Sequence, residues 1–98
     1  MKAVFFISSE SYSKCKNAVY DDDLLSKQSI NFRESKALGM KKEGYYLEID
    51  GSEDSIAHAK KVLGDMAEEA DKKERKEVLN KIEEQENSAA QGFGKIFG

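Results

Sequence analysis

The chain has 98 residues, which is enough for one small domain or for one domain with an appendage. Hydrophobic residues make up 39% of it, charged residues 36%, and the formal net charge is −3. The longest uninterrupted apolar run, residues 3–7, is too short for a membrane-spanning helix or for the apolar part of a secretory signal. We therefore expect a globular protein with a thin core that neither spans a membrane nor is secreted.

Cysteine usage and charge distribution narrow the function classes further. The single cysteine, Cys15, excludes an internal disulfide and a cysteine-cluster metal site, so a reducing cytoplasmic compartment fits best. The excess negative charge lies in residues 51–98, which carry eight Lys or Arg and eleven Asp or Glu. Because phosphate binding usually starts from a basic face, we expect no nucleic-acid partner.

The N-terminal third begins with a dense apolar segment. Residues 2–8 are rich in β-branched and aromatic side chains, which predicts a central strand buried on both faces. Between residues 12 and 25 apolar residues are sparse. Tyr12, Cys15 and Val19 keep a spacing of three and four, which permits a short helix.

The middle of the chain shows strand patterns. Alternation over residues 30–33 predicts a short strand, and residues 37–40 and 45–50 are interpreted as the two arms of a hairpin. Gly44 would supply the positive φ that closes the turn between these arms. In the second arm the apolar residues at 45, 47 and 49 share one face, so the sheet is expected to have one covered face.

A helix is predicted to follow this hairpin. The hydroxyl of Ser52 can cap it, and Glu53 and Asp54 lie in the first turn, where the helix dipole favours negative charge. Gly64 leaves two alternatives open. Either the helix continues through this residue, at a cost of about 1 kcal/mol, or it ends there and Asp65 caps a new helix.

A second helix is predicted from a capping box formed by Asp71 and Glu74, and it runs to about Gln91. Gly92 is a natural helix stop. The chain is therefore divided into an α+β domain over residues 1–91 and an apolar, glycine-rich tail over residues 92–98. The strong apolar anchors of the helix are Val78, Leu79 and Ile82.

The order of these elements defines the expected fold class. Strands come first and helices last, which is an α+β layout. We predict a mostly antiparallel sheet of about four strands, with the two C-terminal helices packed on one face.

An acidic cluster is the first candidate for chemistry. Asp21, Asp22 and Asp23 offer the oxygen ligands that Ca²⁺ or Mg²⁺ prefers. Three contiguous aspartates cannot all reach one ion, so a site would need further ligands from residues 50–54. The alternative is a solvated turn, where acidic residues are common.

Cys15 and His58 are the one thiol and the one imidazole of the chain, so a nucleophile–base pair is conceivable. The sequence indicates no third group that would orient such a pair. We therefore expect no enzymatic activity and no resident cofactor.

Two resemblances extend this interpretation. Residues 44–63 resemble the last strand and helix of a KH nucleic-acid module. The Gly-x-x-Gly loop that defines the module is missing, so we expect no RNA binding of the KH type. The chain as a whole, with its ending from Gly92 to Gly98, resembles small uncharacterised archaeal α+β proteins, mainly over residues 44–98. That resemblance implies the fold class and no activity.

The tail is the strongest candidate for a contact surface. Phe93, Ile96 and Phe97 place three large apolar side chains within the last six residues. They would either complete the core of their own domain or dock into a partner or a second copy of the chain. The sequence thus favours a small non-catalytic interaction or accessory protein that acts through its C-terminal helix and tail. The alternative is a weak binder of divalent cations at Asp21–Asp23.

Overall fold

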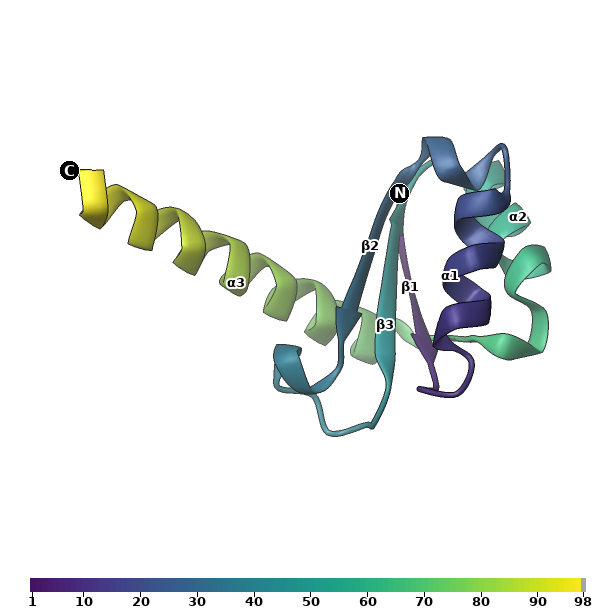
Figure 1. Ribbon diagram of the computed structural model, residues 1–98, viewed down its shortest axis with the longest axis horizontal. Helices are drawn as coiled ribbons and strands as arrows, with labels where there is room; N and C mark the ends of the chain where they lie inside the picture. Colours follow the sequence, from purple (N-terminus) through teal and green to yellow (C-terminus); the bar gives the residue numbers. More distant parts are fainter. Residues whose placement is uncertain (98) are drawn as a thin grey trace.

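The computed structural model describes the backbone of residues 1–97 and the side chains of residues 1–87 (Figure 1). The strands are β1 (Lys2–Ile7), β2 (Ser29–Glu34), β3 (Tyr45–Asp50) and β4 (Glu68–Glu69). The α-helices are α1 (Tyr12–Asp21), α2 (Glu53–Leu63) and α3 (Lys72–Phe97). Short 3₁₀ turns lie at Leu25–Lys27, Lys36–Leu38 and Gly64–Met66.

The four strands form one antiparallel sheet in the order β2-β3-β1-β4. As predicted, β1 is central, and it pairs with β3 over its whole length. Strands β1 and β2 are parallel, are connected through α1 and have β3 between them. Strands β3 and β4 are likewise parallel, are connected through α2 and have β1 between them. This is the split βαβ topology that is called ferredoxin-like. The predicted α+β class with a four-stranded antiparallel sheet is confirmed.

One face of the sheet is covered by α1 and α2 (Figure 1). Alternate residues of the central strands point into this core, because successive side chains of a strand face opposite sides. The core on this face joins Phe5, Ile7, Leu47 and Ile49 of the sheet to Cys15 and Val19 of α1 and to Ile56, Ala59 and Leu63 of α2.

The opposite face is covered by α3, so the prediction that both C-terminal helices pack on one face is wrong. Val4 and Tyr46 point away from α2 and pack against Val78 and Ile82 of α3. Tyr46, which the alternation had placed on an uncovered face, is 1% exposed. The physical reason lies in β1, whose consecutive apolar residues need a cover on both faces.

The hairpin also differs from the prediction. The arm that pairs with β3 is β2, from Ser29↔Asp50 to Glu34↔Tyr45, and not residues 37–40. Lys36–Leu38 forms a 3₁₀ turn, because Leu38 turns into the core under α3. Gly44 does adopt a positive φ, of 149°, at the entry to β3.

Helix α2 begins and ends at recognisable signals. The Ser52 hydroxyl accepts a hydrogen bond of 3.1 Å from Ser55 N, as its capping role predicts. The helix ends at Leu63, and Gly64 has a φ of 51°. Asp65 does not open a new helix, because a 3₁₀ turn follows and leads directly to β4, which pairs with Phe5 and Phe6 of β1.

Helix α3 is longer than predicted. Asp71 caps it, since Asp71 Oδ1 accepts a hydrogen bond of 2.8 Å from Glu74 N. The helix continues through Gly92 to Phe97, so the predicted stop at Gly92 is wrong. Glycine disfavours a helix by about 1 kcal/mol without forbidding it. Figure 1 shows α3 crossing behind the sheet and continuing well beyond the edge formed by β2.

Candidate functional site

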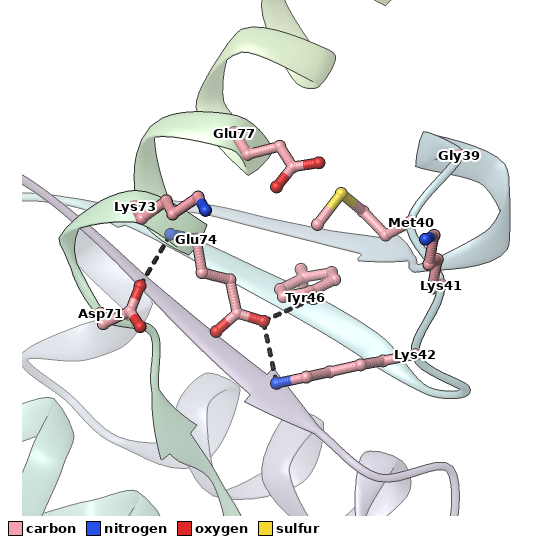
Figure 2. Close-up of a pocket in the computed structure, with 9 residues that line it drawn as sticks. All are labelled: Gly39, Met40, Lys41, Lys42, Tyr46, Asp71, Lys73, Glu74 and Glu77. Carbon is pink, nitrogen blue, oxygen red and sulfur yellow. Dashed lines mark hydrogen bonds and ion pairs between the residues drawn. The ribbon is translucent and has the colours of Figure 1, made fainter.

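A cavity of about 480 Å³ lies where the loop between β2 and β3 meets the first turns of α3 (Figure 2). Tyr46 of β3 contributes its hydroxyl to this cavity. Glu74 Oε2 accepts a hydrogen bond of 2.8 Å from the Tyr46 hydroxyl and lies 2.9 Å from Lys42 Nζ. The further lining residues are Gly39, Met40, Lys41, Asp71, Lys73 and Glu77.

The electrostatics of this cavity are balanced. Burial, reinforced by the hydrogen bond to the Glu74 carboxylate, raises the pKa of Tyr46 far above its ordinary value, so the hydroxyl stays protonated and donates. Lys42 Nζ neutralises the same carboxylate and lies 4.8 Å from the centre of the Phe6 ring. The polar groups thus satisfy one another. We interpret the cavity as the junction that holds the start of α3 on the sheet and sets the helix direction.

The acidic cluster lies at the C-terminal end of α1, where Asp21 is the last helical residue, and its middle residue has a structural role there. Asp22 Oδ1 accepts hydrogen bonds from Leu24 N and Leu25 N, and Asp22 Oδ2 lies 2.8 Å from His58 Nε2. Asp21 and Asp23 are exposed. Among the residues with described side chains, no three His, Cys, Asp or Glu gather closely enough to hold a metal ion. Binding of Ca²⁺ or Mg²⁺ at these aspartates stays a prediction.

Cys15 and His58 have different partners. The Cys15 thiol is fully buried and lies 3.6 Å from the carbonyl oxygen of Met66, as a donor to it. Burial raises the pKa of this thiol, which disfavours the thiolate that a nucleophile requires. His58 pairs with Asp22 across the gap between α2 and the end of α1. This pair links two segments that are 36 residues apart, and sequence reasoning missed it.

The outer edge of β2 is a feature that sequence reasoning also missed. Within residues 1–97, β2 pairs with β3 alone. Ser35 N donates to Gly44 O in the same register, so the odd-numbered residues of β2 direct their backbone groups towards β3. The backbone groups of Ile30, Phe32 and Glu34 therefore face the free edge. The signal in the sequence was an alternating segment, residues 29–34, without proline or glycine.

An aromatic cluster adjoins this edge on the α1 side. The Tyr12 ring stacks on Tyr45 at 3.7 Å between centroids and meets the edge of the Phe32 ring at 5.7 Å. Tyr20 lies 5.9 Å from Phe32 and keeps 48% of its side chain exposed. Leu24, a few residues further along the chain, is 41% exposed. The edge strand is thus bordered by accessible apolar surface.

On its α3 side, the sheet carries a hollow of about 540 Å³. Lys2 and Glu48 form its wall on the sheet, and Leu79, Ile82, Glu83 and Glu86 line it from α3. Glu86 also approaches Arg33 of β2 at 3.8 Å, which places this part of α3 beneath the free edge. The predicted contact residues Phe93, Ile96 and Phe97 belong to the last turns of α3, but their side chains lie outside the described residues.

Comparisons with known proteins add no identification. No family model, curated protein or solved structure matches the chain. The resemblances to a KH module and to archaeal α+β proteins therefore stay predictions. In the described part of the chain, none of the helices combines the length and the apolarity that crossing a membrane requires.

Proposed function

We propose that this protein is a small non-catalytic interaction or accessory protein whose contact surface is the C-terminal part of α3. The observation that carries the proposal is the course of this helix. Its 26 residues correspond to about 39 Å, and the last described contacts with the sheet are made by Gln85 and Glu86 to Arg33. Figure 1 shows the remaining turns projecting past the sheet. We name residues 88–97 the helical extension.

The composition of the helical extension supports a contact role. It contains Gly92 and Gly94, each of which disfavours a helix by about 1 kcal/mol relative to alanine. A projecting helix with this composition gains stability from packing against another surface, because most helical stability in proteins comes from tertiary packing. The apolar residues Phe93, Ile96 and Phe97 provide that packing potential.

The arrangement of the reactive side chains supports a non-catalytic role. The thiol of Cys15 is buried and His58 is held by Asp22, so neither is directed into a cavity with the other. The polar groups of the cavity at the start of α3, Tyr46, Glu74 and Lys42, satisfy one another. A cytoplasmic location belongs to the same proposal, because a lone buried thiol is compatible with a reducing compartment.

The test compares capture of partners by closely matched variants. The full chain is immobilised and exposed to an extract of the cells that make it, beside the variants Phe93→Ser and Phe97→Ser. Gln91→Ser is the control, because it introduces the same side chain into the same segment. We expect the full chain and the control to retain the same partners, including copies of the chain itself, and both phenylalanine variants to lose them. Equal retention by all four proteins would contradict the proposal.

A further inference from the structure

We propose that the partner of the helical extension is a second copy of this chain, joined to the first by antiparallel pairing of the two β2 edges. This inference rests on the proposed function and names its partner. In the resulting dimer the two sheets become continuous. Each helical extension then lies in the hollow on the α3 side of the other copy.

The free edge of β2 is complementary to itself. A twofold axis perpendicular to the sheet places side chains of the same sheet face opposite each other. Because the even-numbered residues of β2 share one face, even-numbered residues of one copy pair with even-numbered residues of the other. With Asn31 on the axis, Ile30 of one copy lies opposite Phe32 of the other, and their outward backbone groups can exchange hydrogen bonds. Ser29 then lies opposite Arg33, so no two like charges meet. The neighbouring register, centred on Phe32, would instead place Ile30 opposite the charged Glu34.

The position of α3 is compatible with this dimer. The helix passes beneath β2 at Arg33, two residues from the axis at Asn31, which corresponds to about 7 Å along the strand. The two copies of α3 would therefore cross the junction about 13 Å apart. Packed helices need about 8–10 Å between their axes, so the two helices pass side by side without collision.

The same geometry directs each helical extension into the hollow of the other copy. The partner's α3 enters beneath Ser29, on the side of the sheet where Lys2 and Glu48 form the wall of the hollow. From residue 87 to residue 97 the helix advances about 15 Å, enough to pass under roughly three strands spaced about 4.8 Å apart. It can therefore reach from beneath its own β2 to β1 of the other copy.

Charge favours this occupant. The hollow combines one lysine with three glutamates, Glu48, Glu83 and Glu86, so it is acidic overall. The one charged side chain in residues 88–97 is Lys95. A segment that brings apolar residues and a single positive charge matches an acidic hollow with an apolar floor at Leu79 and Ile82.

Cysteine cross-linking tests the pairing directly. In the dimer the two copies of Asn31 are opposed as a non-hydrogen-bonded pair, with Cα atoms about 4.5 Å apart, within reach of a disulfide. We expect Asn31→Cys to form a disulfide-linked dimer when oxidised glutathione is supplied as the oxidant. Ser29→Cys is the matched control, because its two copies would lie about 13 Å apart and cannot be bridged. Native Cys15 is buried and does not compete.

A charge-pairing experiment provides the second readout. Asn31→Asp and Asn31→Lys each place like charges opposite each other, and we expect each variant alone to dimerise about fivefold more weakly in sedimentation velocity. An equimolar mixture of the two should restore dimerisation. Circular dichroism establishes that both variants are folded.

The outcomes separate this inference from the proposed function. A monomeric full chain, or a dimer that neither cross-links through Asn31→Cys nor responds to charge at residue 31, would overturn the inference. Partner capture that still requires Phe93 and Phe97 would then leave the proposed function standing. Conversely, a chain that ends at Asn87 could cross-link through Asn31→Cys as efficiently as the full chain. That result would support the pairing of the β2 edges and would contradict the helical extension as a contact surface.

Discussion

Asp22 joins three segments through one carboxylate. It closes the turn after α1 through Leu24 N and Leu25 N, and it binds His58 of α2. The hydrogen bond from Leu25 N, followed by that from His58, lowers the pKa of Asp22 below its ordinary value. The folded state therefore favours the ionised carboxylate. The stability that the ionised carboxylate contributes to the fold is complete above the ordinary aspartate pKa. It is lost as the pH falls through the lowered pKa of Asp22.

The first prediction concerns this carboxylate. Asp22→Asn should lower the thermal unfolding midpoint at pH 7, because the amide cannot replace the negative charge beside His58. The difference from the native chain should shrink as the pH falls from about 4 through the lowered pKa of Asp22, below which Asp22 of the native fold is protonated as well. Asp23→Asn, which alters an exposed neighbour, is the control and should change little. An unaltered unfolding midpoint for Asp22→Asn at pH 7 would show that the pair between Asp22 and His58 does not stabilise the fold.

The second prediction concerns Tyr46. Removing its hydroxyl in Tyr46→Phe breaks the 2.8 Å hydrogen bond to Glu74 and keeps the ring in the core. We expect the free energy of unfolding in urea to fall by about 1.5–3 kcal/mol, as for a hydrogen bond to a charged group. Tyr20→Phe, at a half-exposed tyrosine, should cost less than half as much. Equal effects of the two substitutions would contradict the role of Tyr46 in fixing α3.

At the scale of elements, the loop between β2 and β3 depends on one glycine. A Cβ atom at Gly44 would collide with the carbonyl oxygen of Ile7 and would lie 2.9 Å from the Phe6 ring. Gly39, in the same loop, also has a positive φ, of 79°, but a Cβ atom there would meet no other part of the protein within 4 Å. Any other residue would be strained at both positions, and Gly44 alone adds a backbone collision to that strain.

The third prediction compares these two glycines. Gly39→Ala should destabilise the protein by about 1–2 kcal/mol, the cost of placing alanine in a left-handed conformation. Gly44→Ala should cost clearly more, because β1 and β3 must separate to relieve the collision with Ile7. Urea unfolding followed by circular dichroism measures both. If Gly44→Ala were the milder change, the close approach of the loop to β1 would be wrong.

Elements with a strong periodic signal could be predicted from the sequence, and elements defined by tertiary contacts could not. β1 and the Ser52 cap of α2 have local causes, an apolar run and a hydroxyl at the right position. β4 consists of two exposed glutamates, and its strand conformation comes from pairing with Phe5 and Phe6. The placement of α3 could not be read from Tyr46, because a tyrosine on an otherwise acidic strand face is as compatible with solvent as with a helix above it.

The candidate site divides in the same way. The apolar residues of the C-terminus predict a contact surface there from the sequence alone, and this surface stays a prediction. The free edge of β2 and the acidic hollow beside α3 depend on strand order and on the crossing of α3 over the sheet, and neither is encoded within one segment. The pairing of His58 with Asp22 likewise requires the fold, since 36 residues separate them.

At the scale of the whole molecule, charge predicts which partners are excluded. The net charge is −3, and the hollow beside α3 is acidic. We expect no saturable binding to single-stranded RNA at physiological salt in a fluorescence anisotropy titration. Tight binding that weakens steeply with added salt would contradict this expectation and favour the KH-like interpretation of residues 44–63.

The central claim is that the helical extension serves association and not the stability of its own domain. Sedimentation velocity and urea unfolding of the full chain, beside a chain that ends at Asn87, test it most directly. We predict that the shortened chain loses association while its free energy of unfolding, measured at low protein concentration, stays nearly unchanged. A shortened chain that associates as before but loses several kcal/mol of stability, at about 1.5–3 kcal/mol for each large apolar side chain removed from a core, would contradict the claim.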